Sequence, residues 1–415
     1  MFYAFLKVLV RFVLKIFFRK IYISGLEFVS DTKAQLVSSN HPNGFLEPLI
    51  MACFFPKPLH FLVRGDVFEN PLIRPLLVST NQIPIFRFRD GFTKMRENSQ
   101  TMDDSIQVML DRKNLLIFAE GGTQSIKKLR PLQKGIARIA FQALEKNPDL
   151  NLEVLPVGIN FTYPSHFNAE VMLKIGPPIQ VADFENESKS DNKQSTEQLL
   201  DAIYLGMKNN MVHLEDQHKK HLLEKLLILE RSKLNISYLP VHINDPSRLQ
   251  SEIELASKLS NCKEDRLNKI EKDLDNLEAQ LIKHKLKPGD LLKSNLTIAR
   301  LLILVVGALP AFIGLLFNGL PMLLAYLFRE KKVKQIEFKA SILMIANLIF
   351  FLLYYIIIIL LLFLCRLPFW YLLVIVGCGL WLRYFYEIYT STLFFTGKKI
   401  TDELKHTGIK ILSHL

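Results

Sequence analysis

The chain has 415 residues, of which 49 % are hydrophobic and 22 % are charged, so two to three structural units are expected. This composition excludes a disordered polar chain and a disulfide scaffold, and the four cysteines stand singly, without metal-ligand spacing. The net charge of +12 favours an anionic partner, either nucleic acid or a lipid surface. The apolar residues concentrate in the last third, which points to a membrane.

The first 20 residues hold five basic side chains and no acidic one. Lys7, Arg11, Lys15 and Arg19 recur every four positions, so on a helix they form one stripe with apolar residues on the other faces. A spanning helix would bury three of these cations, and no secretory cleavage site is visible. We therefore predict an interfacial amphipathic helix over 1–24, lying on anionic lipid. The alternative is a surface helix packed on the following domain.

Residues 25–182 alternate short apolar runs with amphipathic segments, which predicts an α/β domain with a central sheet. The expected strands are 34–38, 59–63, 82–86, 114–118, 152–160 and 171–175. The expected helices are 46–54, 70–78, 92–112 and 133–147.

A helical hairpin region is predicted over 183–290, after a polar linker at 183–194. Residues 196–231 and 247–286 have helical patterns. The second helix carries leucines and an isoleucine in steps of three and four, a short seam suited to a helical partner. These are Leu267, Ile270, Leu274, Leu277 and Leu281.

Residues 296–395 form a hydrophobic membrane region, followed by a basic cytoplasmic tail at 396–415. Apolar runs cover 301–328, 341–365 and 367–395, and the first is interrupted by proline and glycine. Basic segments flank these runs, and such short segments stay cytoplasmic. We therefore expect 301–328 to enter and leave on one side, as a broken re-entrant helix or a tight hairpin. The other two runs form a second hairpin, and we expect the α/β domain on the cytoplasmic face.

A histidine and a carboxylate stand in the loop that should follow strand 34–38. His41 and Glu47 would point to different faces of a straight helix, so a loop must bring them together. The carboxylate would hold one ring nitrogen and fix the tautomer, leaving the other to take a proton from a hydroxyl. His-Pro-Asn-Gly is also an ordinary turn, so this block says little alone.

Two later blocks carry groups suited to an anion. An arginine after strand 82–86 can present a planar fork to phosphate, although it is also an ordinary surface residue after an edge strand. Strand 114–118 runs into a Glu-Gly-Gly-Thr turn, whose glycines let backbone N–H groups approach an anion. The candidate phosphate-binding residues are Arg87, Glu120, Gly121, Gly122 and Thr123, with Asn43, Lys127 and Arg130 as supporting residues.

Taken together, the blocks resemble the PlsC-type glycerolipid acyltransferases, which share a His-x4-Asp motif, an arginine block, a Phe-Pro-Glu-Gly block and a proline-containing strand. All four occur here in the family order, the last at 154–160, and the resemblance covers roughly residues 25–180. It is nearest to the branch of yeast-type glycerol-3-phosphate acyltransferases, with one extra residue before the carboxylate and a Glu-Gly-Gly sequence. By this resemblance, His41 and Glu47 correspond to the catalytic pair of the family, and Arg87 corresponds to its phosphate-binding arginine.

This resemblance implies that His41 deprotonates an acceptor hydroxyl as it attacks a thioester. The donor would be acyl-CoA or acyl carrier protein, and the acceptor glycerol 3-phosphate or lysophosphatidate, with anionic membrane lipids as further partners. No cofactor, metal or covalent acyl-enzyme is implied. A nucleic-acid role is disfavoured, because the basic residues flank apolar segments and form no stripe with aromatic residues.

The sequence also departs from the family pattern. Glu47 replaces the aspartate, Ala119 replaces the proline, and Gln124 and Ser125 stand where a basic residue is common. These departures keep open a second class of function, a catalytically decayed lipid-binding or scaffolding membrane protein. A transporter is disfavoured, because the apolar cores 301–317 and 341–364 contain no charged residue.

Overall fold

The computed structural model describes residues 2–86, 98–185, 192–234, 237–394 and 398–415. The chain divides into two compact units. Unit 1 comprises residues 1–213, 241–249 and 336–341, and unit 2 comprises 214–240, 250–335 and 342–415. Each unit is described by itself below.

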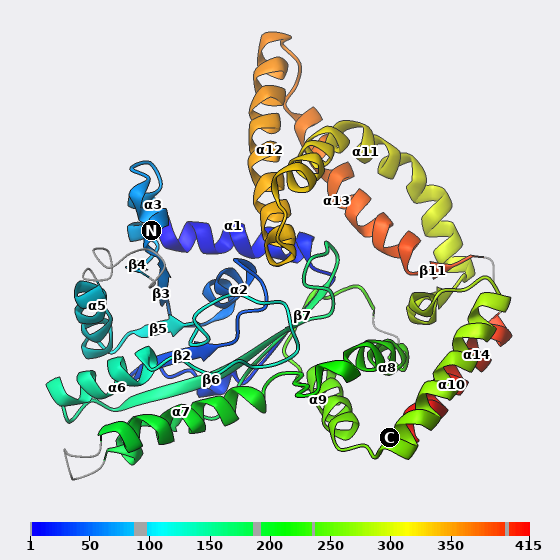
Figure 1. Ribbon diagram of the computed structural model, residues 1–415. Helices are drawn as coiled ribbons and strands as arrows, with labels where there is room; N and C mark the ends of the chain where they lie inside the picture. Colours follow the sequence, from blue (N-terminus) through cyan, green and yellow to red (C-terminus); the bar gives the residue numbers. More distant parts are fainter. Residues whose placement is uncertain (1, 87–97, 186–191, 235–236, 395–397) are drawn as a thin grey trace. The chain divides into compact units, whose positions relative to one another are not determined.

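Unit 1 is built on a mixed sheet of nine described strands, which run β4-β3-β5-β2-β6-β7-β1-β9 with β8 beside β6 (Figure 1). Neighbouring strands are parallel except for β6 against β7 and β6 against β8. The strands are β1 Lys20–Ser24, β2 Ala34–Ser39, β3 Leu59–Arg64, β4 Gln82–Ile85, β5 Asn114–Ile117, β6 Leu152–Phe161, β7 Glu170–Ile175, β8 Ile179–Gln180 and β9 His242–Ile243.

Helices cover both faces of this sheet (Figure 1). The central strands β2 and β6 are buried along their whole length, as expected for apolar strands between two helical layers. The helices α5, α6 and α7 share one hydrophobic core with β2, β5 and β6. The helices of unit 1 are α1 Phe2–Phe17, α2 Leu46–Phe54, α3 Arg74–Ser79, α5 Asn98–Leu110, α6 Gly135–Lys146 and α7 Asn192–Lys208.

These elements confirm the predicted α/β fold and its six strands to within a residue or two. The helices differ more. Of the helix predicted over 70–78 only α3, Arg74–Ser79, is present, after a 3₁₀ helix at Gly65–Glu69, and part of 92–112 lies outside the described residues. The helix α7 belongs to unit 1, although the sequence placed it in the hairpin region.

The N-terminal segment corrects the expected orientation of its basic stripe. Lys7 Nζ donates to the Phe55 carbonyl at 2.7 Å, and Arg11 Nε donates to the Cys53 carbonyl at 3.0 Å. Both cations thus satisfy carbonyls at the C-terminus of α2, where the helix dipole favours positive charge. The outer face of α1 is apolar, with Phe5, Val8 and Phe12 each more than half exposed. The predicted interfacial segment also ends early.

That early end has a structural cause. Residues 20–24 are the strand β1, which pairs with β7 and β9 and is buried in four of its five positions. In the sequence Lys-Ile-Tyr-Ile-Ser, polar and apolar residues alternate less clearly than in a strand with one face in water. The reason is that β1 lies inside the sheet, between the strands β7 and β9.

Unit 2 contains the helices α8 Lys220–Ser232, α10 Glu264–Lys283 and α14 Lys398–Leu412, together with most of α9 Ser247–Ser260. Four of the five predicted seam residues on α10 are buried, Leu267 is partly buried, and α10 packs on α14. The partner of the seam is therefore the C-terminal segment, which folds as an amphipathic helix where the sequence suggested a basic tail. The predicted helix 247–286 is broken at residues 261–263.

In the described part of the chain, three helices are long and apolar enough to cross a membrane. They are α11 Ile298–Lys332, α12 Ile336–Leu364 and α13 Trp370–Thr390. The turn between α12 and α13 covers 365–369, as predicted. A short parallel pair, β10 Ser294–Asn295 with β11 Thr392–Leu393, joins the start of α11 to the end of α13.

The prediction of a broken segment over 301–328 is wrong, because α11 is continuous through both prolines. Its small residues form one buried stripe, which allows close packing against neighbouring helices. Trp381 Nε1 donates to the Gly307 carbonyl at 2.9 Å, and Asn318 Nδ2 donates to the Ile375 carbonyl at 3.2 Å. The buried positions follow in steps of three and four: Leu304, Gly307, Ala311, Gly314, Asn318, Pro321 and Ala325.

The two halves of α11 contact different neighbouring helices. Its first half runs antiparallel to α13, as the pairs above show. Its second half runs back along α12, where Phe328 meets Phe350 with ring centroids 6.3 Å apart. Between the halves, Tyr355 of α12 donates to Asn318 at 2.6 Å. Helix α11 thus contacts both α12 and α13 as one unbroken helix, and the side of the membrane on which its ends lie stays a prediction.

Candidate active site

The histidine of the first block lies just beyond the carboxyl end of β2, beside the end of the parallel strand β5. Side chains that follow neighbouring parallel strands meet at one edge of a sheet, where α/β proteins commonly bind ligands. The imidazole of His41 stacks on Phe118, with ring centroids 4.0 Å apart and planes inclined by 15°. The His41 side chain remains 14 % exposed, so substrate can reach it.

Glu47 is the acidic partner and is completely buried in the first turn of α2. Its Oε2 lies 3.8 Å from His41 Nδ1, and within the described residues neither atom has a hydrogen-bond partner. Its Oε1 accepts a short hydrogen bond from the Asn43 backbone N–H. The predicted convergence of His41 and Glu47 is thus confirmed. An approach of about 0.6 Å or more would bring these atoms to the distance of the Nδ1–H···Oε2 bond that orients the base.

Burial dominates the electrostatics of Glu47. It raises the pKa of this carboxyl, because the charged form loses its hydration, while His41 and the Asn43 N–H lower it to a smaller extent. A nearby imidazolium would favour the carboxylate. The pair is therefore suited to stabilising positive charge that develops on His41.

The turn after Ala119 holds the backbone of His41 on both sides. The Glu120 carboxylate accepts from the His41 N–H at 3.2 Å and from Arg130 Nε at 2.7 Å. The Gln124 N–H donates to the His41 carbonyl at 3.1 Å. Gly121 has a φ of +71°, a conformation that favours glycine and lets the chain reverse here. Predicted as a phosphate ligand, Glu120 here bridges the histidine loop and Arg130.

Of the remaining predicted residues, Gly122, Thr123 and Lys127 belong to the loop after β5, and Arg87 is not among the described residues. Gly122 is next to the Arg130 guanidinium, which donates a short hydrogen bond to its carbonyl. Thr123 and Lys127 are half-buried in the loop that follows. Arg87 lies outside the described residues, so its role stays a prediction.

Two residues that support the His41 loop, Asn40 and Phe118, were not among the predicted site residues. Asn40 is buried and clamps β6, because its Nδ2 donates to the Ile159 carbonyl at 2.9 Å and its Oδ1 accepts from the Ile159 N–H at 2.8 Å. Phe118 supplies the face on which the imidazole stacks. Phe118 stands immediately before the Ala-Glu-Gly-Gly turn, and this position could have identified it. The sequence-based prediction placed it only in strand 114–118.

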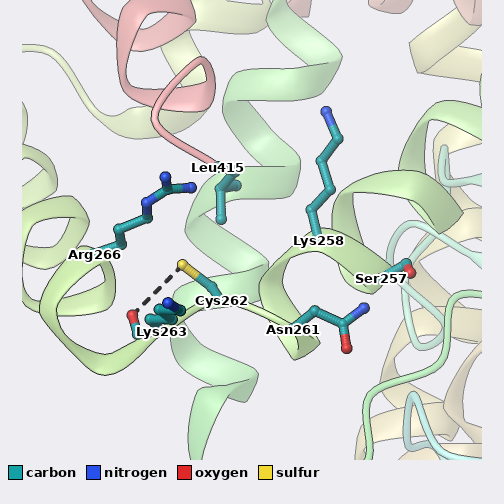
Figure 2. A pocket seen from close by; sticks show the side chains of 7 residues that line it. All are labelled: Ser257, Lys258, Asn261, Cys262, Lys263, Arg266 and Leu415. Atoms are coloured by element: carbon teal, nitrogen blue, oxygen red, sulfur yellow. Dashed lines mark hydrogen bonds between the residues drawn. The ribbon is translucent and has the colours of Figure 1, made fainter.

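A surface pocket of about 360 Å³ lies in unit 2, at the turn between α9 and α10 (Figure 2). Three cations line it, and Cys262 Sγ contacts the Lys263 carbonyl at 3.7 Å. None of its residues belongs to the four sequence blocks. Its lining is Ser257, Lys258, Asn261, Cys262, Lys263, Arg266 and Leu415.

Arg130→Ala is expected to destabilise unit 1, because it leaves the Glu120 carboxylate, whose side chain is 5 % exposed, without its charged partner. A hydrogen bond to a charged group is worth about 1.5–3 kcal/mol, and the 27 % exposure of Arg130 favours the lower end. Thermal unfolding of the detergent-purified protein measures the loss, with the exposed Arg138→Ala as control. Adding Glu120→Gln should recover part of it; no recovery would show that the pair is not the cause.

Part of this chain is similar in sequence to known acyltransferases. Residues 20–160 match the model of the acyltransferase family. Over 105 residues the chain is 32 % identical to glycerol-3-phosphate O-acyltransferase 1 of Saccharomyces cerevisiae, which covers 24 % of this chain and 14 % of the yeast protein. Over 100 residues it is 26 % identical to glycerol-3-phosphate O-acyltransferase 2 of the same yeast, with the same two coverages.

A crystal structure of PlsC, the 1-acyl-sn-glycerophosphate acyltransferase of Thermotoga maritima, aligns with 46 % of this chain and 71 % of its own. Its sequence identity is 17 % and its TM-score is 0.34, below the level that establishes a common fold. The sequence matches stand independently of it. Residues 20–160, which contain the four sequence blocks, thus match the acyltransferase family.

Proposed function

We propose that this protein transfers a fatty acyl chain from a thioester to a hydroxyl of glycerol 3-phosphate or lysophosphatidate at a membrane. The observation that carries the proposal is the His41–Glu47 pair, a partly exposed imidazole whose Nδ1 faces a fully buried carboxylate at 3.8 Å. The matched stretches cover only 14 % of each yeast relative, so the activity is inferred from this site and its family.

In the proposed reaction Glu47 holds the proton on His41 Nδ1, which leaves the Nε2 lone pair free to act as a base. Nε2 removes the acceptor's hydroxyl proton as its oxygen attacks the thioester carbonyl carbon. The carbon–sulfur bond then breaks, and the thiolate recovers the proton from the imidazolium. An ester and a free thiol leave, and both side chains return to their starting state.

The apolar surfaces support a membrane location for this chemistry. The exposed face of α1 and the three long apolar helices of unit 2 suit a protein whose donor chain and acylated product prefer lipid. The catalytic domain would face the cytoplasm, where acyl-CoA and acyl carrier protein are found, and anionic lipids would attract the basic segments.

The test offers purified protein a labelled acyl-CoA or acyl carrier protein with glycerol 3-phosphate, dihydroxyacetone phosphate or lysophosphatidate. We expect an acylated product with one of the three and free thiol in equal amount. Product from none of them, by protein that remains folded, would instead favour the lipid-binding scaffold. The extra methylene of Glu47 is the sequence feature behind that alternative.

Arg87→Ala should raise the KM for the phosphorylated acceptor by about 10- to 100-fold and leave the KM for the thioester within about twofold. The reason is the loss of a charge-assisted contact to phosphate, worth about 1.5–3 kcal/mol. Steady-state kinetics with each substrate varied in turn measures both constants. Equal changes in the two would assign Arg87 to the donor or to the fold.

A further inference from the structure

The first residues of α12 pack directly on the loop that carries the catalytic pair, within unit 1. The Gly44 N–H donates to the Glu337 carbonyl at 2.9 Å. Ser341, which is completely buried, donates from its Oγ to Asn43 Oδ1 at 2.8 Å. Residues almost 300 positions apart in sequence thus share one hydrogen-bonded contact.

Gly44 is required at this contact by its closeness to Phe338. A Cβ at position 44 would lie 2.2 Å from Phe338 Cε1, well inside van der Waals distance. The absent side chain lets the loop backbone reach the carbonyl of Glu337. The glycine of the His-Pro-Asn-Gly sequence therefore has a packing partner far along the chain, in addition to any role in the turn.

Asn43 connects this contact to the catalytic carboxylate. Its backbone N–H donates to Glu47 Oε1, and its side-chain Nδ2 donates to the Pro164 carbonyl at 2.7 Å. With Ser341 on Oδ1, the Asn43 side chain is held from two directions. These side-chain bonds restrain the Asn43 backbone, and a shift of that backbone would move the N–H that bonds Glu47, and hence the Nδ1···Oε2 separation.

We propose that Ser341 is a positioning residue for the His41–Glu47 pair, acting through Asn43. This inference rests on the proposed acyl transfer for its catalytic consequence, but not for the contact itself. Beyond Ser341, α12 continues as an apolar helix to Leu364. A segment of the membrane region therefore supplies part of the support for the active-site loop, so a fragment with all four sequence blocks but without α12 would have a loosened pair.

The kinetic test compares full-length Ser341→Ala and Ser341→Thr in detergent. Loss of one buried hydrogen bond that positions a catalytic group should lower kcat by about 2- to 12-fold, with the acceptor KM within twofold. Threonine keeps the hydroxyl and should restore most of the rate. The matched control is Asn347→Ala, which removes only a bond to the Leu343 carbonyl on the same helix and should change kcat less than twofold.

A second readout does not depend on turnover. Hydrogen exchange of the amides at 43 and 44 should be about 2- to 12-fold faster in Ser341→Ala and unchanged in Asn347→Ala. In a double-mutant cycle, Asn43→Ala should abolish most of the effect of Ser341→Ala on exchange. Ser341→Cys, a weaker donor of similar size, serves the same purpose if the alanine variant does not fold.

The two hypotheses can fail separately. If wild-type protein forms no ester but Ser341→Ala speeds exchange in the loop, the proposed reaction is wrong and the contact stands. If wild-type protein is active and Ser341→Ala changes neither exchange nor kcat, Ser341 has no positioning role. Fully additive effects of the two substitutions would likewise overturn the route through Asn43.

Discussion

His41→Ala is expected to lower acyl transfer by about 10²- to 10⁴-fold, because general base catalysis contributes that much. The variant loses the stacking contact with Phe118. It should still fold, because the ring is partly exposed and makes no side-chain hydrogen bond among the described residues. Initial rates of ester formation, measured with the protein in the same detergent, give the loss.

The matched control for this variant is His218→Ala, an exposed histidine in unit 2 that should keep the full rate. A His41→Ala variant that retains more than a few per cent of the wild-type rate would contradict the assignment of the base. Loss of activity together with an altered elution or melting profile would mean only that the loop had collapsed, so both profiles are recorded.

Glu47→Gln should also be strongly impaired, by about 10²-fold or more. The amide can still accept from the Asn43 N–H, but its NH₂ group would face His41 Nδ1 and favour the tautomer with the proton on Nε2. That tautomer has no lone pair for the acceptor's proton. Glu47→Asp keeps the charge and tests whether the loop can close over the shorter side chain.

The same substitution should have the opposite effect on stability. Because burial raises the pKa of Glu47, this carboxyl ionises first in the unfolded chain as the pH rises past its ordinary pKa of 4.5. The contribution of Glu47 to the free energy of unfolding is therefore fully present below that pH. It decreases as the pH rises further, until the carboxyl has also ionised in the folded protein. Glu47→Gln escapes this loss, so it should melt at a higher temperature than wild type at pH 7.5 but not at pH 4. A lower melting temperature at pH 7.5 would contradict the argument.

The sequence was sufficient for elements whose pattern is local. The strands β2, β5 and β6 are mostly apolar and are buried along their whole length, as expected for strands covered on both faces. The loop after β2 was also predictable, because His41 and Glu47 can converge only if the chain turns between them. Their placement in one site needed no information about distant residues.

The errors arose where a residue's partner is far away. Gly314 and Pro321 read as breaks in a helix, but in α11 they are buried positions on the stripe that faces its neighbours. Lys7 and Arg11 read as a lipid-facing stripe, but the free carbonyls at the end of α2 are their partners. Ser341 could not be placed at all, because nothing near it in sequence suggests a contact with Asn43.

The central claim is that the His41 site transfers the acyl chain directly to a hydroxyl, and one measurement of thiol release tests it. Purified protein is mixed with a labelled acyl thioester, first without an acceptor and then with whichever of the three acceptors tested above gives product. We predict no thiol burst and no labelled protein before the acceptor is added, then thiol and ester in a 1:1 ratio. A stoichiometric burst with label on the protein, or no ester after addition, would contradict the claim.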